Sequence, residues 1–219
     1  MYQNKDLFDL SRTLAAPLFE GKTWPWEVLN DLQDFILKLG PTLPADKFRH
    51  IAPGIWIAND AVVAPTASLH GPLIIDEGAE VRHCAFLRGS ILVGKGAVVG
   101  NSTELKNTLL FDQVQVPHYN YVGDSVLGYK AHFGAGVITS NVKGDKSLVV
   151  IKEGDNRHQT CRKKVGALVG DLGEIGCNTV LNPGTIIGRN TQVYPLCSVR
   201  GCVPANSIYK GEGKIVSKS

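Results

Sequence analysis

Large apolar residues recur at every sixth position over a long central stretch of this chain. The series consists of Ile57, Val63, Leu69, Ile75, Val81, Leu87, Val93, Val99, Leu105 and Phe111. A companion series four residues after each member, from Ala61 to Leu109, is small or apolar, and the six-residue step returns from Val169 to Val199. A period of six fits neither a helix nor a long amphipathic strand, so each hexad is predicted to form a short strand followed by a corner.

Three such hexads, about 18 residues, make one coil of a parallel β-solenoid whose coils stack about 4.8 Å apart. The large residue would fill the interior, and the small companion would let the backbone turn. We therefore predict an all-β parallel β-helix of hexapeptide repeats over residues 51–204, followed by a C-terminal tail at 205–219. The pattern alone does not determine the handedness.

Residues 1–50 show a different, helical spacing. Apolar residues recur every three or four positions from Leu7 to Leu18 and again from Val28 to Leu39, where Gly40 and Pro41 end the pattern. Two amphipathic helices are predicted. The simpler interpretation is an appendage that covers the end or flank of the solenoid, and the alternative is a partner-binding helix.

The hexads also stop between Asn141 and Leu168, so a loop extruded from the solenoid is predicted at 142–168. This basic segment has two extended stretches around the turn sequence EGDN (153–156), which predicts a hairpin. Because loops on rigid scaffolds often carry binding residues, the loop could be a substrate or coenzyme flap. A merely solvated insertion is the alternative.

Composition narrows the class of protein. The 219 residues are 43% hydrophobic and carry 23 Lys+Arg against 20 Asp+Glu, which excludes a disordered chain and does not favour nucleic-acid binding. No stretch predicts a membrane span or a signal peptide, so we expect a cytoplasmic protein. Five scattered cysteines without a CxxC pair, and six histidines without the spacing of a γ-class carbonic anhydrase, predict no metal site.

Two cations occupy the same hexad position one coil apart. Arg88 follows Leu87 and Lys106 follows Leu105, so their side chains should stack on one outer face. Neighbouring cations repel unless an anion lies between them, which indicates a phosphate site. The alternative is structural pairing with Glu104.

A histidine lies where the register slips, near Pro117. His118 precedes Tyr121 and the glycine-rich turn Gly134-Ala135-Gly136. A histidine suits the deprotonation of an amine that attacks a carbonyl, and backbone amides near Gly134 or Gly136 could stabilise the resulting oxyanion.

Two segments resemble a known family. The segment KNTLLFDQVQVPHYNYVGDSVLGYKAHFGAGVITSN (106–141), preceded by LRGSILVGKGAVVGNSTELKN (87–107), resembles the acetyltransferase domain of bifunctional N-acetylglucosamine-1-phosphate uridyltransferase/glucosamine-1-phosphate acetyltransferases. It is also similar to the C-terminal domain of archaeal-type sugar-1-phosphate nucleotidylyltransferases. The resemblance covers about residues 24–204 and implies the left-handed form of the β-helix. No segment here resembles the nucleotidyltransferase domain, so we expect no pyrophosphorylase activity.

The resemblance also implies roles for individual residues. His118 would be the base, and Asn141 would help to hold it. The substrate ligands would be Arg88, Lys106, Tyr121, His132 (where the family has an asparagine) and Lys146 (from a displaced lysine position, for which Lys143 is the other candidate). The coenzyme contacts would be Gly134, Ala135, Gly136 and Cys177.

Together these features predict an N-acetyltransferase. It would transfer acetyl from acetyl-coenzyme A to a hexosamine 1-phosphate, directly and without a metal, in a cyclic homotrimer with sites between prisms. The alternative is a non-catalytic trimeric scaffold or regulatory subunit related to sugar-nucleotide pyrophosphorylases.

Overall fold

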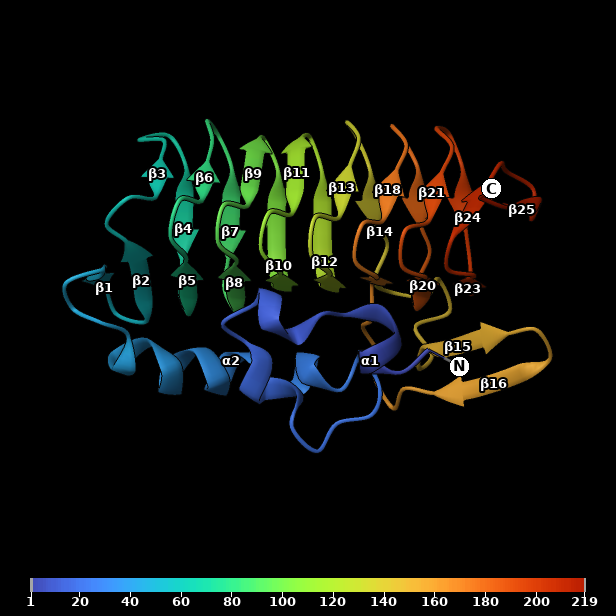
Figure 1. The fold of residues 1–219 in the computed structure, drawn as a ribbon, viewed down its shortest axis with the longest axis horizontal. Helices are drawn as coiled ribbons and strands as arrows, with labels where there is room; N and C mark the ends of the chain where they lie inside the picture. Colours follow the sequence, from blue (N-terminus) through green and yellow to red (C-terminus); the bar gives the residue numbers. More distant parts are fainter. Residues whose placement is uncertain (1, 219) are drawn as a thin grey trace.

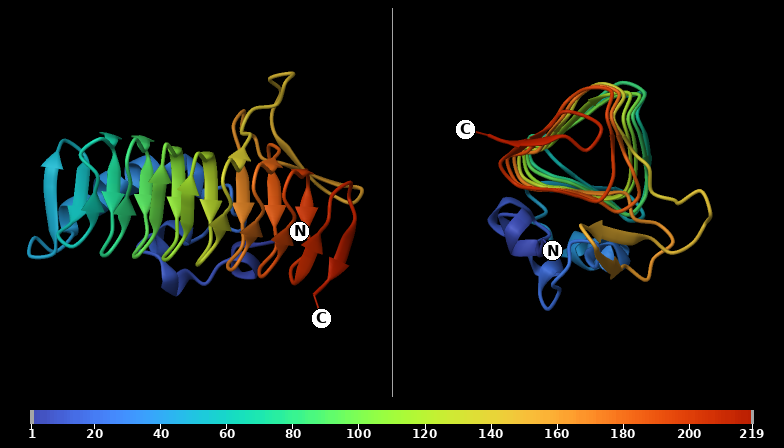
Figure 2. Two further views of the ribbon diagram at one scale, coloured as in Figure 1. Left: turned by 90° about the horizontal axis from the view of Figure 1, so that it is seen from above. Right: turned by 90° about the vertical axis from the view of Figure 1, so that its right-hand side faces the viewer.

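The computed structural model describes residues 2–218 and shows a triangular prism of stacked coils with a helical segment along one side (Figures 1 and 2). We number the three faces in chain order. Face I contains β3 (Val62–Val63), β6 (Glu80–Val81), β9 (Val98–Asn101), β11 (Gln115–His118), β13 (His132–Phe133), β18 (Glu174–Ile175), β21 (Gln192–Val193), β24 (Ser207–Tyr209) and the antiparallel β25 (Ile215–Ser217).

Faces II and III share two long strands, β10 (Glu104–Leu110) and β12 (Tyr121–Leu127), which continue around the corner between them. Face II adds β4 (Ser68–His70), β7 (Phe86–Arg88), β14 (Ile138–Thr139), β19 (Val180–Leu181) and β22 (Ser198–Val199). Face III adds β2 (Ile55–Ala58), β5 (Leu73–Ile75), β8 (Ile91–Val93), β17 (Ala167–Val169), β20 (Thr185–Ile187) and β23 (Cys202–Val203).

The predicted fold class is confirmed. Within the prism the strands of neighbouring coils pair in parallel, and the antiparallel pairs are the terminal ones, β1 (Phe48–Ala52) with β2 and β24 with β25. Seen from its C-terminal end in Figure 2, the chain runs clockwise as it advances toward the viewer, which is a left-handed winding.

Face III is buried on both sides, whereas faces I and II alternate between buried and exposed positions. Its middle column is apolar, and Ile74, Leu92 and Leu168 are each 0% exposed. The N-terminal segment lies along this face and contacts β8 and β10. Burying one such side chain contributes about 1.5–3 kcal/mol. The interpretation of residues 1–50 as an appendage on the flank of the solenoid is therefore confirmed.

The predicted register is wrong at Phe111. Leu110, not Phe111, pairs with Val93 in the inward column of face III, because the corner at Asn107 is one residue shorter than the Gly89-Ser90 corner of the preceding coil. The slip therefore begins before Pro117. Phe111 points outward, and its ring lies 5.1 Å from Phe8 and 5.9 Å from Phe19 of the N-terminal segment.

The first predicted helix is also wrong. Residues Leu7–Leu18 form the end of α1 (Asn4–Leu7) and parts of two 3-10 turns, Leu10–Arg12 and Ala16–Phe19. The backbone is extended at Asp9, whose N–H donates to Asp171 of the solenoid at 2.8 Å. The second helix is confirmed as α2 (Val28–Leu39), which a 3-10 turn at Gly40–Thr42 follows.

The loop leaves the prism after Ser140 and returns at Gly166. It carries the predicted hairpin, formed by β15 (Val150–Glu153) and β16 (Asn156–Gln159). The segment predicted as a tail contains regular structure within residues 205–218, because β24 and β25 extend face I.

Candidate functional site

The corner between faces I and II brings three predicted residues into one column. The strand pairing places His118, Ala135 and Cys177 at the same position in three successive coils. Backbone bonds tie the column together: Gly136 N–H donates to the His118 carbonyl at 3.0 Å, and Asn178 N–H donates to the Ala135 carbonyl at 2.8 Å. His118 is exposed, and among residues 2–218 no side chain bonds its imidazole.

The hydrogen bonds of the glycine-rich turn narrow the choice of expected oxyanion donors. Gly134 N–H donates to the Ile175 carbonyl at 2.8 Å, and Gly136 N–H is committed to His118. Within the described chain, the N–H of Ala135 has no partner, so Ala135 is the residue of this turn with a donor to offer. Glycine is required at 134 because a Cβ would lie 2.7 Å from the Cys177 nitrogen.

Face II carries the predicted tyrosine and asparagine. Tyr121 begins β12, and its hydroxyl accepts a hydrogen bond from Asn141 Nδ2 at 3.3 Å. The ring lies over Gly123, where a Cβ would approach the Tyr121 hydroxyl to 2.6 Å. Burial raises the pKa of Tyr121 above its ordinary value, with Asn141 opposing the shift, so the phenol stays protonated at neutral pH.

A buried carboxylate at the corner between faces II and III joins these residues to a cation. Asp124, 3% exposed in its side chain, accepts from Asn141 Nδ2 at 2.6 Å and from Asn107 Nδ2 at 2.9 Å. Lys106 Nζ lies 3.3 Å from the same carboxylate, and Arg162 Nη2 lies 3.9 Å from it. Asp124 and Asn107 both have left-handed backbone, with φ of 47°. In each case this single residue forms the corner, whereas the coil before Asn107 uses the two residues Gly89 and Ser90.

The predicted cation stack is present. Arg88 and Lys106 follow one register across β7 and β10, and both line one cavity. Each cation already has a carboxylate: Arg88 Nη1 lies 2.7 Å from Glu104, and Lys106 pairs with Asp124. The structural pairing with Glu104 is therefore real. It uses one of the five N–H donors of Arg88 and leaves others for a ligand.

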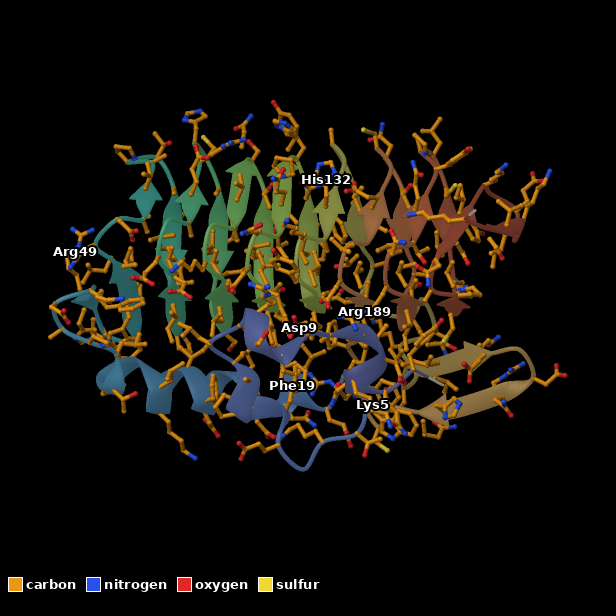
Figure 3. All side chains as sticks on the ribbon, viewed as in Figure 1. Lys5, Asp9, Phe19, Arg49, His132 and Arg189 are labelled. Atoms are coloured by element: carbon orange, nitrogen blue, oxygen red, sulfur yellow. The ribbon has the colours of Figure 1, made fainter. Side chains whose placement is uncertain are left out.

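Two predicted ligands lie apart from this group within the chain. His132 is on face I, where its Nδ1 lies 2.9 Å from Glu174, and Figure 3 shows it at the edge of the prism remote from the N-terminal segment. Lys146 is exposed on the loop, and Lys143 bonds there to Ser147.

Sequence reasoning missed Asp124 and Arg162. Arg162 lies in the loop and reaches the corner only because the chain folds back after the hairpin, which no local pattern reveals. The sequence did contain a sign of Asp124. It lies 17 residues after Asn107, where a regular coil has 18, and both are polar residues at a shortened corner.

Comparison with known proteins finds a family match within the solenoid and a curated relative that aligns over most of the chain. Residues 69–154 match the GMPPB C-terminal domain family. The chain is 30% identical over 197 residues to the bifunctional protein GlmU of Methanococcus maripaludis, covering 89% of this chain and 48% of that protein. It is 32% identical over 109 residues to the bifunctional sugar-1-phosphate nucleotidylyltransferase/acetyltransferase of Sulfurisphaera tokodaii, covering 50% of this chain and 27% of that protein.

The predicted resemblance is confirmed. The chain spans about half the length, or less, of these curated relatives. Among solved structures, the polySia-specific acetyltransferase NeuO matches 76% of this chain and 88% of its own at 11% identity and a TM-score of 0.47. A variant of perosamine N-acetyltransferase from Caulobacter crescentus, in complex with CoA and GDP-perosamine, matches 74% of this chain and 56% of its own at 17% identity and a TM-score of 0.36.

The described residues contain neither a membrane-spanning helix nor a cluster of metal-binding side chains. Across residues 2–218, no helix is long and apolar enough to cross a membrane. The same stretch holds no group of three or more His, Cys, Asp or Glu side chains arranged to bind a metal ion.

Proposed function

We propose that the chain is an N-acetyltransferase that moves acetyl from acetyl-coenzyme A to the amino group of a hexosamine 1-phosphate. One observation carries the proposal. An exposed histidine and a pair of stacked cations lie at the two ends of the same short stretch of face II, and hydrogen bonds through Tyr121, Asn141 and Asp124 connect that stretch to Lys106. The names of the relatives and of the structural neighbours, several of them acetyltransferases of sugars or sugar nucleotides, support the reaction class.

The geometry suggests how the residues would share the work. The imidazole of His118 has no side-chain partner among residues 2–218, and it would take the proton from the amine as the amine attacks the thioester carbonyl. The uncommitted N–H of Ala135, one coil away in the same column, would stabilise the oxyanion that forms. The thioester is already activated, so transfer within a ternary complex needs no covalent enzyme intermediate.

The coenzyme would lie along the corner column. Ala135 and Cys177 follow His118 there, and the structures of the Caulobacter acetyltransferase contain CoA, which supports the same class of donor here. The sugar would lie on face II over Tyr121, with its phosphate toward Arg88 and Lys106.

We propose that three copies assemble, with the sites between neighbouring prisms. Faces I and II are not covered by the chain itself, and several large apolar side chains are exposed there, among them Tyr119 (63%), Ile138 (40%) and Phe86 (37%). Apposition of face I of one copy to face II of another would also give His132 of a neighbouring copy access to the site.

One observation favours the scaffold alternative. Both cations of the stack already have carboxylate partners within the chain, as a purely structural network would require. An acetyltransferase would consume acetyl-coenzyme A and a scaffold would not, so an activity assay distinguishes the two functions.

Release of free coenzyme A thiol, measured over a panel of amino-sugar phosphates, tests the proposal. His118→Ala should lower kcat by about 10²–10⁴ with little change in coenzyme binding. His83→Ala is the matched control, because His83 lies in the same corner column two coils earlier. Absence of turnover with every amino-sugar phosphate would favour the scaffold.

A further inference from the structure

A polar cavity of about 430 Å³ lies where helix α2 passes the corner between faces II and III. Its walls come from three parts of the chain: the solenoid corner, α2 and the end of the loop. Three cations and one carboxylate face it, namely Arg88, Lys106, Arg162 and Asp124. Arg162 is the unexpected member, since it lies 56 residues after Lys106 in the sequence.

Helix α2 is attached to this corner by polar contacts as well as by packing. Asn107 Nδ2 donates to the Leu29 carbonyl at 3.3 Å, and Ser90 Oγ donates to Gln33 Oε1 at 3.4 Å. The Arg162 guanidinium bonds to the Asn30 side chain. Figure 1 shows α2 running beside β8 and β10, so the helix forms a wall on the face III side of the cavity.

The charge of the cavity matches a phosphomonoester. Three cations and the Asp124 carboxylate line the cavity, and Glu104, which pairs with Arg88, lowers the net charge of the group to +1. This positive charge has the sign that a phosphomonoester requires, since such a group carries close to two negative charges at pH 7. Arg162 is held at the cavity by Asn30, by the Lys164 carbonyl at 3.2 Å and by Asp124. Its side chain is 16% exposed, so it adds a charge with little freedom to move away.

We propose that Arg162 is the third phosphate ligand and that α2 restricts the site to sugars ending in a phosphomonoester. This inference rests on the proposed function, and it names the substrate class of the same site. A sugar on face II would place its phosphate at the corner, and a nucleoside attached to that phosphate would continue into the wall formed by Leu29, Asn30 and Gln33. Sugars linked to a nucleoside diphosphate are therefore excluded.

Calorimetric binding and turnover, each measured with glucosamine 1-phosphate and with UDP-glucosamine, test the proposal. The wild type should bind and acetylate the monophosphate and should bind the nucleotide sugar at least tenfold more weakly. Arg162→Met should raise Kd and KM for glucosamine 1-phosphate about tenfold or more and leave KM for acetyl-coenzyme A unchanged, while Arg162→Lys should restore part of the binding. Arg157→Met is the control, because Arg157 lies in the same loop and donates to the backbone carbonyls of Gly154 and Asn156 in the hairpin.

The outcomes separate this inference from the proposed function. Turnover with unchanged Kd in Arg162→Met, or equal binding of UDP-glucosamine by the wild type, overturns the inference and leaves the acetyltransferase intact. Binding of glucosamine 1-phosphate that depends on Arg162, without acetyl transfer, supports the phosphate site and removes the proposed function. An Arg162→Met protein that loses its native circular dichroism together with its binding, while Arg162→Lys folds but binds no better, assigns Arg162 a structural role and overturns the inference.

Discussion

Asp124 is the residue on which the corner depends most, and its replacement by asparagine tests the description of the site. One carboxylate oxygen, Oδ1, faces Asn107 and Arg162, and the other, Oδ2, faces Asn141 and Lys106. All four partners are donors. An asparagine must turn its own NH₂ toward one pair of them, so one donor pair loses its acceptor whichever way the amide is oriented.

The size of the effect follows from these contacts. Removing one member of a buried, hydrogen-bonded ion pair costs about 3–5 kcal/mol. Lys106 and Arg162 are 26% and 16% exposed, so water can partly replace the lost charge. We therefore expect Asp124→Asn to lower the free energy of unfolding by an amount near the lower end, about 3 kcal/mol.

Urea unfolding at pH 7 measures this loss. Asp145→Asn is the control, because Asp145 is an exposed loop carboxylate bonded to Ser147 and Lys143, and its replacement should change stability by less than about 0.5 kcal/mol. A loss below about 1 kcal/mol in Asp124→Asn would show that the surrounding donors do not depend on this carboxylate. The account of the corner would then be wrong.

Three further measurements test the fold and the assembly. Burial raises the pKa of Asp76 from 3.8 to about 6, so the folded state binds this proton more tightly than the unfolded state does, and stability should fall as the pH rises from about 4 to 6. Asp76→Asn should abolish that fall and raise the free energy of unfolding at pH 7 by up to about 3 kcal/mol. Urea unfolding at pH 4.5 and at pH 7 measures both effects. Phe111→Ala should cost about 3–5 kcal/mol and expose the N-terminal segment to limited proteolysis, because Phe8 and Phe19 lose their shared partner; unchanged protection would contradict this packing. Sedimentation should give three times the 23.6 kDa chain mass for the wild type and a lower mass for Ile138→Asp on face II, and a stable wild-type monomer would remove the trimer.

The solenoid could be predicted because its rule is local. Each hexad places its own residue inward, so the apolar series from Ile57 to Leu105 predicts the core without knowledge of any distant contact. The same rule failed at Phe111 because the corner at Asn107 is one residue shorter, which places Leu110 inward and Phe111 outward. Phe111 is apolar because its ring packs against Phe8 outside the prism. The helix predicted at Leu7–Leu18 failed for a related reason, since apolar spacing shows which residues are buried but not what they are buried against.

The candidate site also has one part that the spacing of the repeat could predict and one part that it could not. Arg88 and Lys106 could be placed together because they share a hexad position, and His118 and Ala135 share a column because consecutive coils have nearly constant length. Cys177 lies beyond the loop, 42 residues after Ala135, and the family resemblance rather than the spacing assigned it to the same site. No periodic rule extends through the loop, so nothing in the sequence places Arg162 beside Lys106.

The elements outside the repeat are what distinguish this prism from a bare solenoid. A regular coil offers an open corner at Arg88 and Lys106, to which a phosphate could bind with any group attached beyond it. Helix α2 and Arg162 both come from non-repeating sequence, both contact that corner, and they bond to each other through Asn30. Because the loop arginine is held by the helix, loss of either element should disturb the other. Binding of a sugar phosphate at this corner should therefore protect the loop from proteolysis as well as the helix.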